Sequence, residues 1–321
     1  MRIPYEKYHG TGNDFVVVSA DAPVPDRRAF AIAHCDRETG VGTPGAVEES
    51  DGDREAADVG GRRIGADGVL FLALDEEVSP PRVEMTLYQP DGGTAAMCGN
   101  GARCAALWAA RRLRRLGMDD RAEPASTRRK MGDGHETFAI DTPAGIRRAT
   151  VDDGGITVEM GVPSFDPGDV PVDSAGPMIA TDLLGYEVSA VDTGVPHAVI
   201  LVDEVNDVDL EAMAPPIRHA DVFPEGANVT VASPRAEGGF TQRTFERGVE
   251  GETQACGTGA VAIVAVAKRL GLYGGAGPVP VSPPGGELSI TIPDDGSPVT
   301  LRGPASYEWR GTLPAVPEVE P

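Results

Sequence analysis

Two stretches of the sequence each place a cysteine directly before a glycine-rich turn and a run of small or apolar residues. Cys98 begins the segment CGNGARCAA, and Cys256 begins the segment CGTGAVAIV. A cysteine before a helix faces unpaired backbone N–H groups and the positive end of the helix dipole, and both favour the thiolate over the thiol. The glycines let the backbone approach a ligand closely, and their N–H groups can hold a carboxylate. Each turn therefore combines a reactive sulfur with an anion-binding backbone.

Two such thiols permit two chemistries. They can form a redox-active disulfide, or they can act as an acid and a base on opposite faces of one carbon, which inverts that stereocentre. Removal of an α-proton from an amino acid leaves a carbanion, and two helix N-termini directed at its carboxylate would stabilise it. Lysine occurs only at Lys7, Lys130 and Lys268, outside these motifs, which argues against a pyridoxal phosphate Schiff base.

The other two cysteines have no such setting. Cys104 lies inside the first helical run without a glycine neighbour, and we expect it, like Cys35, to have a structural role. Cys98 and Cys104 have no histidine close by in the sequence, and the chain has no C-x-x-C pair, so we expect no metal site. The irregular spacing of the cysteines does not predict a disulfide framework.

Charge and composition exclude several classes of protein. The formal net charge of −22 repels nucleic acid and anionic membranes. Because nearly all basic residues are arginine, the strong acidity favours adaptation to high salt, with an acidic interaction surface as the alternative. The N-terminus lacks the apolar segment of a signal peptide, and no stretch is apolar enough to span a membrane. We expect a cytoplasmic protein that binds a small molecule.

Hydrophobic patterning predicts strands and helices that are organised alike in the two halves of the chain. Predicted strands cover residues 15–19, 69–74, 82–88, 137–140, 156–160, 197–202 and 228–232. Predicted helices follow the two cysteine turns, at 102–116, ended by Gly117, and at 259–270, closed by Gly271. The second helix is almost wholly apolar, so we expect it to lie in a core.

A chain of 321 residues predicts two domains. The expected divisions are an N-terminal half at 1–140, a C-terminal half at 141–297 and a tail at 312–321. Acidic, glycine-rich residues 43–60 predict a solvated insertion, and residues 117–135 are similar. The strand-like segment 298–311 is a candidate to return to the first half.

Four segments of the sequence resemble the diaminopimelate epimerase family: KYHGTGNDF, PDGGTAAMCGNGARC, FPEGANVTVA and ERGVEGETQACGTGA. The resemblance runs from Lys7 to about Leu270, interrupted by the acidic insertions. It implies a cofactor-independent epimerase that interconverts LL- and meso-diaminopimelate on the route to lysine. It also implies an α+β fold of two pseudo-symmetric domains, each a mixed sheet wrapped around a central helix. The active site is expected in the cleft between them, and the assembly is expected to be a homodimer.

The resemblance also implies roles for single residues. Cys98 and Cys256 are the acid/base pair, with Cys98 as the donor and Cys256 as the acceptor in one reaction direction. The reacting carboxylate is expected at the backbone N–H groups of Gly99, Asn100, Gly257 and Thr258. The other polar groups of the substrate are expected at Asn13, Asn228, Glu246 and Arg247. His197 is expected to orient or tune a catalytic thiol, with a structural histidine of the core as the alternative.

Two positions depart from the family pattern. The family commonly has asparagine where this chain has Gln89 in YQPDGG and Val195 in GVPH. Gln89 offers the same amide on a longer side chain, whereas Val195 makes no polar side-chain contact. A related two-thiol racemase of histidine or proline type is therefore an alternative, and a thiol–disulfide switch is a second one. Glu246 and Arg247 favour a substrate with a second charged end, because a guanidinium binds a distal carboxylate with two parallel hydrogen bonds.

Overall fold

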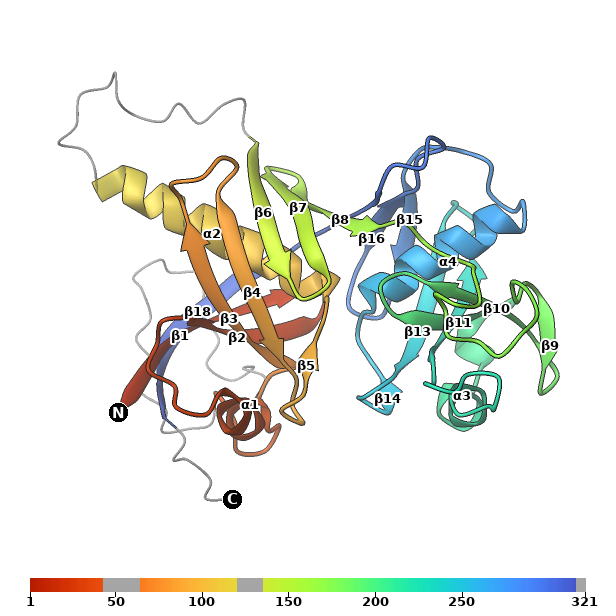
Figure 1. The fold of residues 1–321 in the computed structure, drawn as a ribbon, viewed down its shortest axis with the longest axis horizontal. Coiled ribbons are helices and arrows are strands. Elements are labelled where there is room, and N and C mark those ends of the chain that lie inside the picture. The colour runs from red at the N-terminus through yellow and green to blue at the C-terminus, as the bar shows by residue number, and fades with distance from the viewer. Residues whose placement is uncertain (43–63, 120–134, 316–321) are drawn as a thin grey trace. The chain divides into compact units, whose positions relative to one another are not determined.

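The computed structural model describes residues 1–42, 64–119 and 135–315 (Figure 1). The chain divides into two compact units, of which the second comprises residues 159–303 and the first the remainder. The sequence places these two boundaries at 140 and 297. The predicted insertion at 43–60 lies outside the described residues, as does most of 117–135.

The first unit is a mixed β-sheet with two helices. Its strands follow the order β18 (Ser306–Pro314), β1 (Arg2–Gly10), β2 (Asn13–Ser19), β3 (Gly68–Asp75), β4 (Arg82–Tyr88), β6 (Glu136–Thr142), β7 (Gly145–Asp152) and β8 (Gly155–Gly161). Neighbours are antiparallel except for the parallel pairs β2–β3 and β4–β6. The short β5 (Thr94–Ala95) pairs with the end of β4. Helix α1 (Arg27–Cys35) lies in the first parallel crossover, and helix α2 (Gly99–Asp119) lies in the second.

The second unit repeats this arrangement. Its strands follow the order β9 (Thr181–Leu183), β10 (Tyr186–Asp192), β11 (Pro196–Leu201), β12 (Asn228–Pro234), β13 (Phe240–Glu246), β15 (Val279–Ser282), β16 (Leu288–Thr291) and β17 (Val299–Gly303). The parallel pairs are β11–β12 and β13–β15, and β14 (Gly251–Glu252) pairs with the end of β13. The 3-10 helix η1 (Val205–Asp207) and helix α3 (Leu210–Arg218) lie in the first crossover, and helix α4 (Gly257–Arg269) lies in the second.

The two units therefore share one connectivity, and their strand pairs run parallel and antiparallel in the same succession. Cys98 immediately precedes α2, and Cys256 immediately precedes α4. The repeat that the two cysteine turns predict is thus a repeat of the whole unit, as the expected α+β fold requires.

Each central helix is enclosed by its own sheet (Figure 1). Helix α2 packs against β1, β3, β4, β6, β7 and β18, and α4 packs against β10, β11, β12, β13, β16 and β17. Every residue of α4 from Gly257 to Ala267 is buried, as its apolar sequence predicts. In α2 the buried side chains are mostly small, which lets the strands approach the helix closely.

Three predicted boundaries differ from the structure. Helix α2 continues to Asp119, because Gly117 keeps a helical conformation, at a modest cost in stability. Gly271, in contrast, has a φ of 72° and ends α4 as predicted. The segment 298–311 is divided, since β17 belongs to the second unit and β18 pairs with β1 in the first. The predicted tail begins too early, because residues 312–314 complete β18 by pairing with residues 2–4.

Cys35 and Cys104 have the structural role that the sequence predicts. Both side chains are buried, and burial raises the pKa of Cys35 to about 12 and that of Cys104 further still. Neither thiol is therefore reactive near neutral pH. Among the described residues, no three His, Cys, Asp or Glu side chains are grouped so that they could hold a metal ion. None of the helices in these ranges has the length and apolar composition needed to cross a membrane.

Candidate active site

The first cysteine turn lies at the N-terminus of α2. Cys98 is partly exposed, and its Sγ accepts a hydrogen bond from the backbone N–H of Gly101 at 3.3 Å. The end of β1 lies close to this turn. A Cβ added at Gly10 would lie only 3.2 Å from the carbonyl oxygen of Asn100. The first N–H groups of a helix have no partner within the helix, so this turn can bind an anion.

The second cysteine turn is more deeply buried. Cys256 is only 6% exposed, and its Sγ lies 3.3 Å from Oγ1 of Thr258. Burial, together with the carboxylate of Glu246, raises the pKa of Cys256 well above its usual value, and hydrogen bonds from Thr258 and Gly259 offset only part of this rise. At Cys256 the pKa shift runs opposite to the direction expected from a helix N-terminus, because burial outweighs the hydrogen bonds that favour the thiolate.

A buried imidazole connects the second turn to the sheet. Nε2 of His197 lies 3.0 Å from Oγ1 of Thr258, and Nδ1 lies 3.0 Å from Oγ1 of Thr230. Burial lowers the pKa of His197 to about 3, and the charge of Arg247 contributes to this shift. His197 is thus neutral near pH 7, and it reaches Cys256 only through the hydroxyl of Thr258.

Three predicted binding residues of the second unit lie near this imidazole or near Cys256. Oδ1 of Asn228 accepts from the backbone N–H of Arg247 at 2.7 Å, and Nδ2 of Asn228 lies 3.4 Å from Nε2 of His197. Glu246 accepts from the hydroxyl of Thr253 at 2.6 Å, across the turn between β13 and β14. These contacts fix the start of the turn that carries Glu246 and Arg247.

Asn13 is the predicted side-chain ligand of the substrate in the first unit. It opens β2 after the turn at Thr11 and Gly12, both of which have positive φ angles. Its Oδ1 accepts from Nδ2 of Asn100 at 2.5 Å. The structure thus gathers the predicted residues into two groups, each at the N-terminus of a central helix. One group holds Asn13, Gly99, Asn100 and Cys98, and the other holds His197, Asn228, Glu246, Arg247, Cys256, Gly257 and Thr258.

Comparison with known proteins decides the family. The sequence model described as "Diaminopimelate epimerase" matches residues 54–165 and 189–308. A diaminopimelate epimerase of Methanothrix thermoacetophila is 39% identical over 97% of this chain and 96% of its own length. One of Archaeoglobus fulgidus is 34% identical over 98% of this chain and 97% of its own. The chain belongs to the diaminopimelate epimerase family.

Solved structures of lower identity show the same fold. A hydroxyproline epimerase from Agrobacterium vitis has a TM-score of 0.60 at 16% identity and covers 97% of this chain and 91% of that protein. A probable proline racemase from Agrobacterium radiobacter has a TM-score of 0.59, also at 16% identity, over 98% of this chain and 94% of that protein. The predicted two-domain α+β fold is therefore confirmed.

Gln89 and Val195, the two positions at which this diaminopimelate epimerase family member departs from the family pattern, both lie in turns. Gln89 begins the turn after β4, and its backbone N–H donates to the carbonyl of Gly93 at 2.8 Å. Val195 lies in the turn before β11, which is one residue longer than the corresponding turn before β2. Because of this extra residue, strand register aligns Asn13 with Pro196 and Asp14 with His197.

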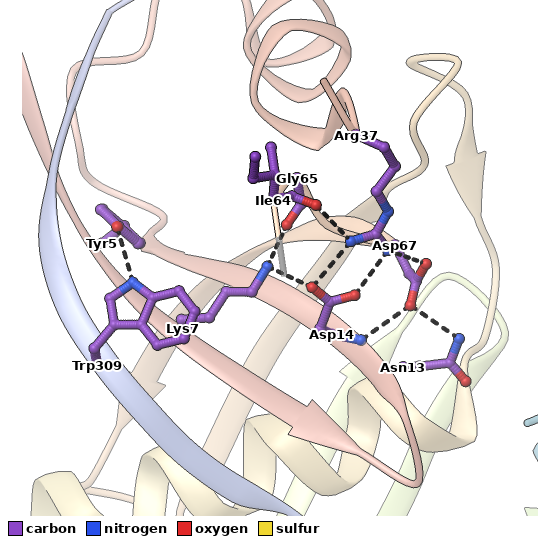
Figure 2. A network of polar contacts seen from close by, with 9 residues as sticks. All are labelled: Tyr5, Lys7, Asn13, Asp14, Arg37, Ile64, Gly65, Asp67 and Trp309. Carbon is purple, nitrogen blue, oxygen red and sulfur yellow. Dashed lines mark hydrogen bonds and ion pairs between the residues drawn. The ribbon is translucent and has the colours of Figure 1, made fainter. Parts of the chain in front are cut away.

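A charged network beside Asn13 was not predicted from the sequence (Figure 2). Nζ of the buried Lys7 lies 2.6 Å from Oδ2 of Asp14 and donates to the carbonyl of Gly65 at 2.5 Å. Arg37 donates to Asp14 at 2.8 Å and also to Asp67. Burial alone would raise the pKa of Asp14, but Arg37 and Lys7 lower it below its usual range. The only hint in the sequence is Asp67 in GADG, at the place that Asn228 occupies in GANV.

Proposed function

We propose that this chain is a diaminopimelate epimerase that inverts the α-carbon between the LL and meso forms with Cys98 and Cys256. The observation that carries the proposal is the repeated unit, which places one cysteine at the N-terminus of each central helix. A symmetrical pair of thiols suits a reaction that removes a proton from one face of a carbon and returns one to the other. Family membership supports the substrate.

The protonation state of Cys256 assigns the starting roles. Its raised pKa keeps the proton on sulfur near neutral pH, so Cys256 is the acid when Cys98 starts as the thiolate. The Cys98 thiolate takes the α-proton, the electrons of the C–H bond remain on the carbanion, and the Cys256 thiol protonates the opposite face. The reverse reaction exchanges the roles, and the expected assignment of Cys98 as donor and Cys256 as acceptor describes that direction.

The reacting carboxylate binds the backbone N–H groups of Gly99, Asn100, Gly257 and Thr258 in this proposal, and these groups stabilise the carbanion. Asn13, Asn228, Glu246 and Arg247 bind the other polar groups of the substrate. Arg247 is suited to the distal carboxylate, because Nη1 is the one guanidinium nitrogen that donates to other described residues, at 3.2 Å to the carbonyl of Glu225 and 3.5 Å to that of Gly226. His197 supports the thiol of Cys256 through Thr258.

The wider setting is proposed on composition and resemblance. The net charge of −22 with scarce lysine supports a salt-adapted cytoplasmic enzyme of lysine biosynthesis. We expect a homodimer without a cofactor. Val195 keeps one rival open, a racemase of proline or histidine type, because a valine there removes a polar contact to a second charged end.

An isotope-exchange assay tests the proposal. Reduced enzyme in molar salt and D₂O receives LL- or meso-diaminopimelate, with proline, histidine and glutamate in parallel, and no cofactor is added. We expect deuterium at the α-carbon and interconversion of the two diaminopimelate isomers alone. Exchange of proline or histidine instead would establish the rival racemase. Absence of all exchange, with a redox-dependent Cys98–Cys256 disulfide, would establish a thiol switch.

A further inference from the structure

The side-chain amide of Asn13 lies between two polar neighbours. Its Nδ2 donates to Oδ2 of Asp67 at 3.2 Å, and its Oδ1 accepts from Nδ2 of Asn100 at 2.5 Å. The amide nitrogen only donates and the amide oxygen only accepts, so each neighbour fixes one end of the amide. Asn13 is partly exposed while Asn100 is buried, so in this hydrogen-bonded pair Asn13 is the residue that a ligand can reach.

Arg103 sets the direction of this hydrogen-bond chain at one end. Its side chain is fully buried, and its Nη2 donates to Oδ1 of Asn100 at 2.8 Å and to Oγ1 of Thr11 at 2.6 Å. A guanidinium has donors only, so the oxygen of Asn100 must face Arg103 and its nitrogen must face Asn13. Asn100 cannot turn over without placing two donors against each other.

Asp67 sets the direction at the other end (Figure 2). Its carboxylate accepts from Asn13, from the backbone N–H of Asp14 at 3.0 Å and from Arg37. Arg37 is itself fixed by Asp14 at 2.8 Å and by the carbonyl of Ile64 at 3.0 Å. Because an ionised carboxylate only accepts, Asp67 holds the nitrogen of Asn13 on its side.

The second unit has none of the four side chains of this hydrogen-bond chain at the equivalent positions. Strand register and distance from the cysteine place Pro196 where the first unit has Asn13, and Asn228 where it has Asp67. Thr258 replaces Asn100, and Val261 replaces Arg103. Where the position of Asn13 carries no amide, the guanidinium at one end and the carboxylate at the other are also absent.

We propose that Arg103 and Asp67 are positioning residues that fix the orientation of the Asn13 amide toward the substrate, with Arg37 holding Asp67 in place. The inference rests on the proposed function, in which Asn13 binds a polar group of an amino acid. The amide then offers its second N–H on the Asp67 side and the second lone pair of Oδ1 on the Asn100 side. The N–H suits a carboxylate oxygen and the lone pair suits an ammonium group, so an amino-acid end meets donor and acceptor in a fixed order.

A double-mutant cycle tests whether Asp67 acts through Asn13. Asp67→Asn is isosteric. With its NH₂ toward Asn13 it sets two donors face to face, and with its NH₂ toward Arg37 it loses the contact that holds it in place, so either placement weakens the fixed orientation of the Asn13 amide. We expect kcat/KM for α-proton exchange to fall about tenfold, the scale of one hydrogen bond to a charged group, mainly through KM. In the Asn13→Ala background the same change should cost less than about twofold. Asp141→Asn, in a surface ion pair of the same unit, is the matched control and should have no effect.

The outcomes separate the two proposals. Equal losses from Asp67→Asn in both backgrounds, or no loss in the otherwise unchanged enzyme, would overturn the positioning role while leaving the epimerase assignment intact. Absence of α-proton exchange in the unsubstituted enzyme would instead contradict the proposed function. If Asp67→Asn does not fold, Arg37→Gln enters the same cycle, because Arg37 is 35% exposed in its side chain and its loss releases Asp67.

A second readout needs no substrate. The side-chain NH₂ of Asn13 can be assigned in a ¹⁵N–¹H spectrum by its disappearance in Asn13→Ala. We expect one of its two hydrogens to be shifted and protected from solvent exchange by Asp67, and Asp67→Asn to remove both effects. Arg103→Gln should do the same from the other end of the chain. Signals of Asn13 that stay unchanged in both variants would contradict the inference.

Discussion

The two cysteine turns occupy the same place in one repeated topology, yet the polar groups behind them differ in kind. In the first unit, Asp14 pairs with Lys7 and Arg37 in a charged network. In the second unit, the corresponding position is His197, which is neutral and contacts the hydroxyls of Thr230 and Thr258. The repeated fold therefore gives the two sulfur atoms equivalent positions in their units. The neighbouring residues make the surroundings of the two turns different in charge.

This difference suits the proposed division of labour. Burial and the carboxylate of Glu246 raise the pKa of the Cys256 thiol and keep its proton in place. The charged network of the first unit instead fixes the residues that bind the substrate beside Cys98.

The largest effect is expected from removing either sulfur. Cys98→Ala and Cys256→Ala should each lower the rate of epimerisation by at least about 10³-fold, because acid or base on one face of the carbon is lost. Cys104→Ala, at a buried site in α2, is the control and should retain activity after correction for the folded fraction. Chiral separation of the two isomers measures the rate, and an active Cys98→Ala or Cys256→Ala enzyme would refute the two-thiol mechanism.

Breaking the charged network should be the next largest effect. Asp14→Asn leaves the buried ammonium group of Lys7 without its carboxylate, while the partly exposed Arg37 keeps Asp67, and this should lower the free energy of unfolding by about 3–5 kcal/mol. Asp141→Asn breaks the exposed pair with Arg82 and should change stability far less. Urea unfolding in molar salt compares the two variants. Similar losses would show that the network of the first unit is no more than a surface ion pair.

The hydroxyl of Thr258 should have a moderate effect. Thr258→Val removes the donor that partly offsets the raised pKa of Cys256, so this pKa should rise further and the alkaline limb of kcat should move to higher pH. A decrease in kcat of about tenfold near neutral pH should accompany the shift. Thr258→Ser keeps the hydroxyl and should restore the normal profile. An unchanged profile in Thr258→Val would exclude Thr258 from the support of the thiol.

The smallest expected effect is the contribution of His197 to the loss of folding stability at acidic pH. Its pKa of about 3 in the folded state lies below its unfolded value of about 6.5, so the unfolded chain binds more protons between these values. Stability from neutral His197 is complete above about pH 6.5 and is lost as the pH falls toward 3. His197→Gln should make the free energy of unfolding depend less on pH in this window. The loss of stability from Asp14, in contrast, begins only below about pH 4. An unchanged slope in the variant would show that His197 is charged in the folded protein.

Local patterns in the sequence were enough for much of the fold and for the cysteine turns. The apolar run after Gly257 predicts the central helix α4, and the alternation in residues 82–88 predicts β4 with its observed bounds. Helix α3 was not predicted, because Pro215 and Pro216 interrupt its pattern and packing against β12 and β13 overrides propensity.

The chemistry around the turns depends on pairings between distant segments. Asp14 meets Asp67 and Arg37 only because β2 and β3 run parallel, and local sequence does not reveal that register. The raised pKa of Cys256 follows from burial by the whole unit, whereas its helix N-terminus alone predicts the opposite direction. Local signals predict the two cysteines as the reactive groups, and tertiary packing sets the direction of the pKa shift at Cys256.

The central claim is that two different sulfur atoms handle the proton on the two faces of one carbon. The direct measurement follows optical rotation or circular dichroism while reduced enzyme converts LL-diaminopimelate in D₂O. Two bases load deuterium into the product but not into the remaining substrate at early times, so the signal should pass transiently beyond its equilibrium value before it returns. A monotonic approach to equilibrium, with deuterium appearing equally early in substrate and product, would contradict the account.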